Sequence, residues 1–102
     1  MTRVCDRLET LLDVPHRVRA EDVIVTDEAF EGGYGKIGPS TREAIRLAAR
    51  CEALVLDPVY TAKSFAALVA LLRREPDGGP VVWVHTGGLP ALFAYGAEIF
   101  DD

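Results

Sequence analysis

Three short apolar runs constrain the fold of this chain more than any other feature of its sequence. They occupy residues 23–25, 53–56 and 81–84, and polar or turn residues follow each of them. Runs of this length, rich in Val and Leu, are typical of strands buried in a parallel sheet. The sequence therefore predicts three core strands.

Segments with helical periodicity separate the predicted strands. A first helix is expected before the first run, because Val4, Leu8, Leu11 and Leu12 fall on one helical face. A second helix is expected from Ser40, as N-cap with Glu43 as its capping-box partner, to about residue 50. Two more are expected over residues 62–74 and from about Pro90.

Strands alternating with helices predict an α/β fold. We expect one domain over residues 1–102, a three-layer αβα fragment with a short, mainly parallel sheet. Ligands of such sheets bind at the carboxyl ends of the strands. Those ends carry polar and glycine residues at positions 26–27, 57–61 and 85–88, where a site is therefore expected.

Charge and composition exclude several classes of function. The 102 residues include 11 basic and 16 acidic side chains, a net charge of −5, which does not suit nucleic acid or anionic lipid. No apolar run is long enough to span a bilayer, and the cytoplasm is the expected compartment. No metal site is expected, because His16, His85, Cys5 and Cys51 lack the spacing of metal ligands.

Residues 33–38, Gly-Tyr-Gly-Lys-Ile-Gly, match the dinucleotide-binding pattern GxGxxG. However, Pro39 and Ser40 place the helix start after the last glycine, which the fingerprint requires inside the helix. A plain glycine loop is favoured, and nucleotide binding stays an alternative. On pattern alone, the segments 57–63 and 85–88 are also explained by ordinary helix caps and turns.

Taken together and in order, the motifs resemble one enzyme family. Gly-Tyr-Gly at 33–35, Glu-Ala-Ile-Arg at 43–46, Asp-Pro-Val-Tyr-Thr-Ala-Lys at 57–63 and His-Thr-Gly-Gly-Leu-Pro-Ala-Leu-Phe-Ala-Tyr at 85–95 resemble the C-terminal third of D-cysteine desulfhydrases and ACC deaminases. These are fold-type II, tryptophan synthase beta-like enzymes that use pyridoxal phosphate. The resemblance covers about residues 23–96.

The resemblance implies roles for five residues. Tyr60 would lie over the cofactor and handle protons at the substrate, and Tyr34 is similar to the family's second active-site tyrosine. Thr86 matches a residue beside the pyridine nitrogen, and Gly87 and Thr61 are the other expected cofactor-binding residues. Thr61 follows the desulfhydrase form, whereas ACC deaminases carry Glu there. The implied activity is a lyase or deaminase acting on a small amino acid, with ACC deaminase as the alternative.

The family's Schiff-base lysine and phosphate-binding loop have no match in this sequence. Its only lysines are Lys36 and Lys63, and Lys63 matches the motif's own lysine rather than the cofactor lysine. We therefore expect no turnover by these residues alone. The expected partners are further copies of the chain or a separate N-terminal half of the enzyme. A non-catalytic interaction module is the other class of function that the sequence leaves open.

Overall fold

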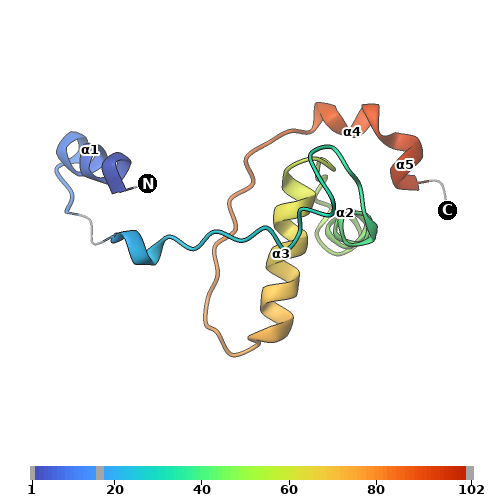
Figure 1. The fold of residues 1–102 in the computed structure, drawn as a ribbon. Coiled ribbons are helices and arrows are strands. Elements are labelled where there is room, and N and C mark those ends of the chain that lie inside the picture. The colour runs from blue at the N-terminus through green and yellow to red at the C-terminus, as the bar shows by residue number, and fades with distance from the viewer. Residues whose placement is uncertain (1, 16–17, 101–102) are drawn as a thin grey trace.

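The computed structural model describes residues 2–15 and 18–100, and every regular element in this part of the chain is a helix (Figure 1). His16, considered above as a metal ligand, lies outside the described residues. The elements in chain order are α1 (Thr2–Leu12), the short 3₁₀ helix η1 (Ala20–Asp22), α2 (Pro39–Glu52), α3 (Thr61–Arg74), α4 (Pro90–Ala94) and α5 (Gly96–Phe100).

The predicted αβα fold with a parallel sheet is wrong for the described residues. Residues 23–25, 53–56 and 81–84 form no strand. A strand exists only where a neighbouring extended segment satisfies its backbone N–H and C=O groups. No such ladder joins these three runs in the part of the chain that the structure describes. Their apolar, β-branched composition sets a preference for strand but does not supply the partner.

The middle run, residues 53–56, shows a second reason for the error. Ala53 adopts a left-handed conformation with φ 54° and ends α2, and the N–H of Leu54 still donates to the carbonyl of Ala48. The first two residues of the expected strand therefore belong to the helix cap. Only Leu56 is buried, while Leu54 and Val55 are exposed, so the run is not covered on both faces.

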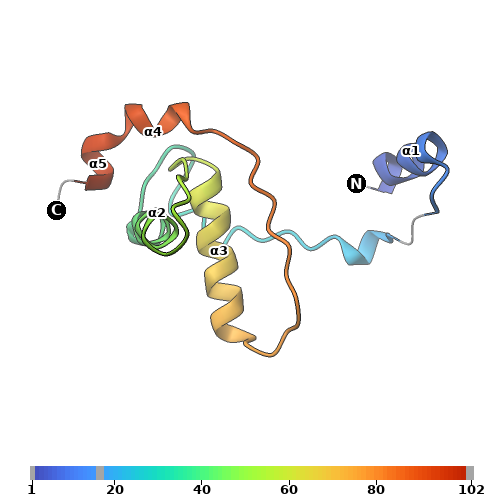
Figure 2. The same cartoon turned by 180° about the vertical axis from the view of Figure 1, so that it is seen from behind.

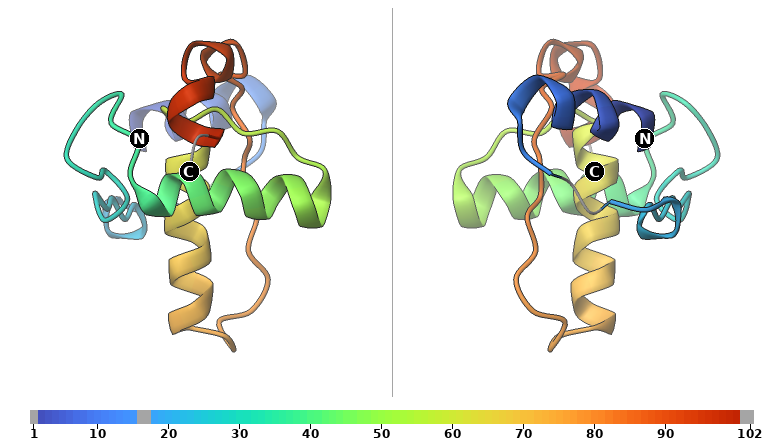
Figure 3. Two further views of the ribbon diagram at one scale, coloured as in Figure 1. Left: turned by 90° about the vertical axis from the view of Figure 1, so that its right-hand side faces the viewer. Right: turned by 90° about the vertical axis from the view of Figure 1, so that its left-hand side faces the viewer.

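The predicted helices are present, and among the described helices α2 and α3 contact one another most extensively. They cross one another (Figure 3), and Ile45 and Ala48 of α2 meet Ala62 of α3 at the crossing. Leu56 and Ile99 complete this buried cluster. Partly buried apolar side chains pack around it: Ile37, Phe65, Trp83, Leu92 and Tyr95. The core is therefore small and lies where the middle of α2 meets the beginning of α3.

After α3 the chain turns and residues 81–88 run back beside that helix toward α4 (Figures 1 and 2). Trp83 anchors this segment. Its ring packs edge to face on Phe65, with the centroids 5.2 Å apart, and its Nε1–H donates to Ser64 at 3.3 Å. The next turn, with Thr86, is thereby held near the beginning of α3.

Much apolar surface remains uncovered. Ile24, Val25 and Val82 are each 88% or 89% exposed. Helix α1 lies away from the other helices (Figure 1), with Leu11 and Leu12 exposed. The accessible area is 7812 Å², against roughly 5,700 Å² for a compact monomer of this mass. The radius of gyration is 16.2 Å, against about 13 Å for a compact domain of this length.

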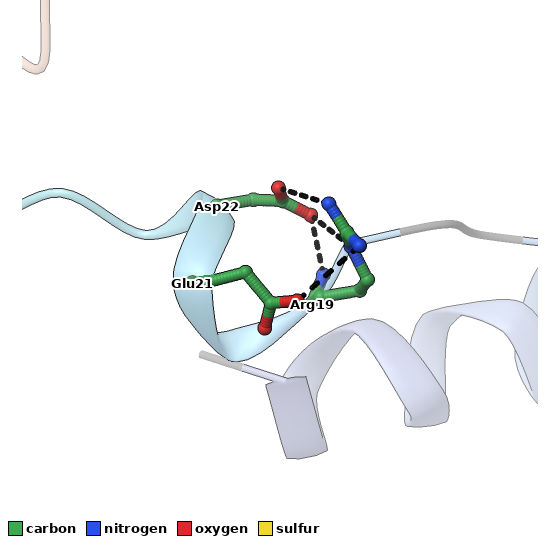
Figure 4. A network of polar contacts seen from close by, with 3 residues as sticks. All are labelled: Arg19, Glu21 and Asp22. Atoms are coloured by element: carbon green, nitrogen blue, oxygen red, sulfur yellow. Dashed lines mark hydrogen bonds and ion pairs between the residues drawn. The ribbon is translucent and has the colours of Figure 1, made fainter.

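The segment between α1 and α2 contains the short 3₁₀ helix η1 (Figure 4). The Asp22 carboxylate accepts a hydrogen bond from the backbone N–H of Arg19 at 2.8 Å and pairs with its guanidinium at 3.2 Å. The guanidinium also pairs with Glu21 at 3.3 Å. These hydrogen bonds from the Arg19 side chain and backbone lower the pKa of Asp22. The turn is exposed and stands apart from the site described below.

None of the helices described is both long and apolar enough to cross a membrane.

Candidate functional site

An open cavity of about 710 Å³ lies between the loop that precedes α2, the beginning of α3 and the returning segment 83–86. Three of the five residues that the family resemblance singled out line it, namely Tyr34, Tyr60 and Thr86. The other lining residues are Thr26, Asp27, Ala29, Phe30, Val59, Lys63, Ser64, Ala67, Trp83 and Val84. The cavity is thus mainly apolar, with a few hydroxyls and one free carboxylate side chain.

Tyr34 and Tyr60 form a direct pair in this cavity. Their hydroxyl oxygens are 2.6 Å apart, and their rings meet edge to face with centroids 5.9 Å apart. The hydrogen bond with Tyr34 is the main cause that raises the pKa of Tyr60 above its usual 10.0, and partial desolvation and the charge of Asp57 act in the same direction. The Tyr60 hydroxyl carries its proton at neutral pH, as tyrosine ordinarily does, and can donate it.

A buried carboxylate sets the position of Tyr60. Asp57 is fully buried, and its Oδ2 accepts hydrogen bonds from the N–H groups of Val59 and Tyr60, both at 2.8 Å. Its Oδ1 accepts from the N–H and hydroxyl of Thr61, at 2.8 Å and 2.6 Å. Burial raises the pKa of Asp57, but the hydrogen bonds from Thr61, Tyr60 and Val59 outweigh it and lower the pKa overall.

Thr61 and Gly87 do not line the cavity. Thr61 is buried, and its hydroxyl donates to Asp57 rather than pointing toward a ligand. Gly87 adopts φ 96°, a left-handed conformation that favours glycine, and its N–H donates to Nδ1 of His85 at 3.1 Å. The structure therefore gives both residues a role in shaping the two turns that carry Tyr60 and Thr86.

Lys63 lines the cavity, but its ammonium group is already engaged. The Nζ donates to the carbonyl of Phe30 at 2.8 Å and to that of Gly33 at 2.9 Å. It also lies 5.4 Å from the centre of the Phe30 ring. These contacts fasten the loop that carries Tyr34 to α3. Lys36, the other lysine, is exposed and does not line the cavity.

A second carboxylate, Glu31, fixes the other end of the same loop. It accepts hydrogen bonds from the backbone N–H of Gly38 at 3.0 Å and of Ser40 at 2.9 Å, and from the hydroxyls of Ser40 and Thr41. Burial raises the pKa of Glu31, but the hydrogen bonds from Thr41, Ser40 and Gly38 outweigh it and lower the pKa.

The contacts of Glu31 bear on the predicted capping box at Ser40 and on the nucleotide-binding alternative for residues 33–38. The capping box of Ser40 with Glu43 is wrong, because Gly38 is the N-cap and Glu43 pairs with Arg73 at 3.2 Å. As expected, α2 begins after the last glycine of the GxGxxG hexapeptide, at Pro39. The protein's own carboxylate occupies the helix N-terminus where a nucleotide phosphate would have to lie. The hexapeptide is therefore explained as a capped glycine loop.

Sequence reasoning did not identify several residues that build this site. Asp57 was noted as the end of a predicted strand and as part of the 57–63 motif, but its capping role was not recognised, although its spacing to Thr61 is the signal of a carboxylate capping the next helix. Glu31 lies seven residues before Gly38, the N-cap of the helix that it caps, a separation without a local signal. Phe30 and Trp83 reach the cavity only because separate segments fold onto α3.

A search against models of known protein families found no match for this chain. Within residues 2–15 and 18–100, no cluster of three or more His, Cys, Asp or Glu side chains is placed to hold a metal ion.

Proposed function

We propose that this chain contributes one wall of the active site of a pyridoxal-phosphate-dependent lyase of the D-cysteine desulfhydrase type. The observation that carries the proposal is the pairing of Tyr34 with Tyr60. The two residues are 26 positions apart in sequence, yet their hydroxyls lie 2.6 Å from one another in a cavity that Thr86 also lines. The resemblance to the family independently predicted these three residues as one site.

The cavity suits the ring of the cofactor. Its volume of about 710 Å³ falls within the roughly 300–1,000 Å³ of ordinary small-molecule sites. Val84, Ala67 and Trp83 offer apolar surface on which a flat ring packs. The hydroxyl of Thr86 can donate to or accept from the pyridine nitrogen. The cofactor, when bound, supplies the electron sink for bond breaking at the substrate.

The tyrosine pair supplies proton transfer in this proposal. Tyr60 is protonated at neutral pH, as a tyrosine ordinarily is, and the hydrogen bond with Tyr34 raises its pKa further. Its Oη can donate a proton to the departing group of a small amino acid. The Tyr34 Oη, 2.6 Å away, can then return a proton to Tyr60. Solvent water then returns a proton to Tyr34, whose side chain is exposed.

The covalent attachment of the cofactor needs an amine from residues outside these 102. The Nζ of Lys63 is held by the carbonyls of Phe30 and Gly33, and Lys36 does not line the cavity. We accordingly assign to this chain the binding of the ring and the movement of protons, and not the formation of the covalent bond.

Binding of pyridoxine phosphate tests the proposal. This cofactor form has an alcohol in place of the aldehyde, so no lysine is needed for it to bind. With isotope-labelled tyrosine, we expect its addition to shift the nuclear magnetic resonance signals of Tyr34 and Tyr60. Unchanged signals from the pair at millimolar ligand would refute the cofactor site.

Activity of the isolated chain is the second half of the test. Mixed with pyridoxal phosphate and D-cysteine, it should release no sulfide, because the amine is not supplied. Sulfide release above that of pyridoxal phosphate alone would contradict the division of roles proposed here.

A role as an interaction module is the second candidate, and the uncovered apolar segments favour it. Ile24, Val25, Val82 and Val84 are strongly exposed in segments without regular secondary structure. Such surface associates with other copies or with a partner polypeptide. Light scattering coupled to size exclusion should show a species larger than 11.1 kDa, and a Val25→Ser/Val82→Ser variant should be smaller. A monomeric wild-type chain at high concentration would exclude self-association.

A further inference from the structure

We propose that Asp57 is the positioning residue of this site. It keeps the hydroxyl of Tyr60 within hydrogen-bond distance of Tyr34, and it keeps the turn that contains Thr86 beside the two tyrosines. The inference rests on the proposed function for its meaning, since it assigns a role in the same site. The geometry on which it depends is independent of any ligand.

Asp57 fixes the backbone of Tyr60 and of its two neighbours in sequence. Both carboxylate oxygens are used, and they accept the N–H groups of three successive residues, Val59, Tyr60 and Thr61, all at 2.8 Å. The N–H of Asp57 donates in return to the Thr61 hydroxyl at 2.9 Å. Charge-assisted hydrogen bonds of this kind are stronger than neutral ones. The turn from which the Tyr60 side chain projects is therefore held at three consecutive peptide groups.

The carboxylate of Asp57 also lies against Gly88, in the glycine turn after residue 85. A methyl group built on Gly88 would lie 2.6 Å from Oδ1 of Asp57, which is closer than any real contact. Gly88 also has φ 98°, a conformation that side chains rarely adopt. The carboxylate thus lies directly against the backbone of the turn that begins at Thr86. One buried group contacts both of the segments that bring hydroxyls into the cavity.

The two tyrosines of the pair are restrained from different sides. Tyr34 and Tyr60 are both largely exposed, so packing alone does not hold their rings. The Tyr34 loop is fastened to α3 by Lys63 and to α2 by Glu31. Asp57 is the corresponding restraint on the side of Tyr60. Loss of this restraint should separate the hydroxyls while leaving the helices formed.

The experiment measures the pKa of each tyrosine in the full chain by nuclear magnetic resonance with isotope-labelled tyrosine. The variant Tyr34→Phe gives the pKa of Tyr60 without its partner. In the wild type, Tyr60 should titrate above 10.0. In Asp57→Ala, it should titrate below its value in Tyr34→Phe, because the charge of Asp57, which also raises the pKa of Tyr60, is lost together with the pair. In Asp57→Asn, an amide oxygen still accepts hydrogen bonds from the turn, and the pKa should stay closer to that of the wild type.

Asp27→Asn is the matched control. Asp27 is an exposed carboxylate that lines the same cavity and lies outside the turn of residues 57–61, so its loss removes the same charge and leaves the turn intact. Tyr60 should titrate as in the wild type. A wild-type pKa in Asp57→Ala would overturn the inference. Equal shifts in Asp57→Asn and Asp57→Ala would also overturn it, because the charge and not the acceptor geometry would then be responsible.

Two further measurements keep the test decisive. If Asp57→Ala does not fold, Gly88→Ala, which forces a methyl group against the carboxylate, should give the same loss of the pair, and a retained pair would refute the inference. Asp57→Ala should also weaken pyridoxine phosphate binding by about tenfold, the worth of one hydrogen bond. If the wild type binds no pyridoxine phosphate but the pKa results hold, the proposed function fails and the positioning role stands.

Discussion

Replacement of Glu31 by alanine should destabilise the chain more than any other single change in the loop that carries Tyr34. Two contributions can be worked from the structure. Loss of a helix cap costs about 1 kcal/mol. Thr41 is fully buried, and leaving its hydroxyl without a partner costs about 1–3 kcal/mol more. The expected loss in the free energy of unfolding is therefore about 3 kcal/mol. Glu31 itself has φ 47°, and alanine keeps its Cβ, so backbone strain largely cancels.

The assay is urea unfolding followed by circular dichroism at neutral and at acid pH. Because the pKa of Glu31 is lowered in the folded chain, its stabilisation is fully present above the ordinary value of 4.5 and is lost as the pH falls through the folded pKa. The difference between wild type and Glu31→Ala should therefore be constant near neutrality and shrink below 4.5.

Glu28→Ala is the matched control for this prediction. Glu28 lies in the same loop and pairs with Arg74 at 2.9 Å, but both side chains are more than half exposed. Exposed pairs of this kind contribute about 0–1 kcal/mol. If Glu31→Ala costs no more than Glu28→Ala, or if its cost does not depend on pH, the assignment of Glu31 as the cap of α2 is refuted.

Two other changes test the same loop. Gly38→Ala should lower stability by about 1–3 kcal/mol, because its methyl would lie 2.5 Å from the Glu31 carboxylate, and a normal unfolding midpoint would contradict this. Lys63→Met should lower the free energy of unfolding by about 1.5–3 kcal/mol, because it removes two hydrogen bonds, to the carbonyls of Phe30 and Gly33. It should also speed amide hydrogen exchange in that loop, while exchange where α2 crosses α3 stays unchanged. Uniformly faster exchange would show instead that Lys63 supports the whole fold.

The helices were predictable because their signals are local. The apolar spacing of Phe65, Leu68 and Leu72 lies within one segment, and α3 follows it from Thr61 to Arg74. Likewise Pro39, placed after the glycines, marks the beginning of α2. The strands were not predictable in this way. Val81 and Val82 have the composition of a strand, but pairing needs a second backbone at the correct distance, which sequence preference does not provide.

For the candidate site too, some features were predictable from the sequence and others only from the structure. From the sequence alone, Tyr34, Tyr60 and Thr86 stand out as one set through the resemblance of their motifs to a single family. Only the tertiary structure decided that the two tyrosine hydroxyls meet at 2.6 Å and that Thr86 borders the same cavity. Only the structure also decided that Thr61 faces Asp57 instead of the cavity. The physical reason is that residue type fixes the chemistry a side chain can perform, whereas its partners depend on which distant segments fold against it.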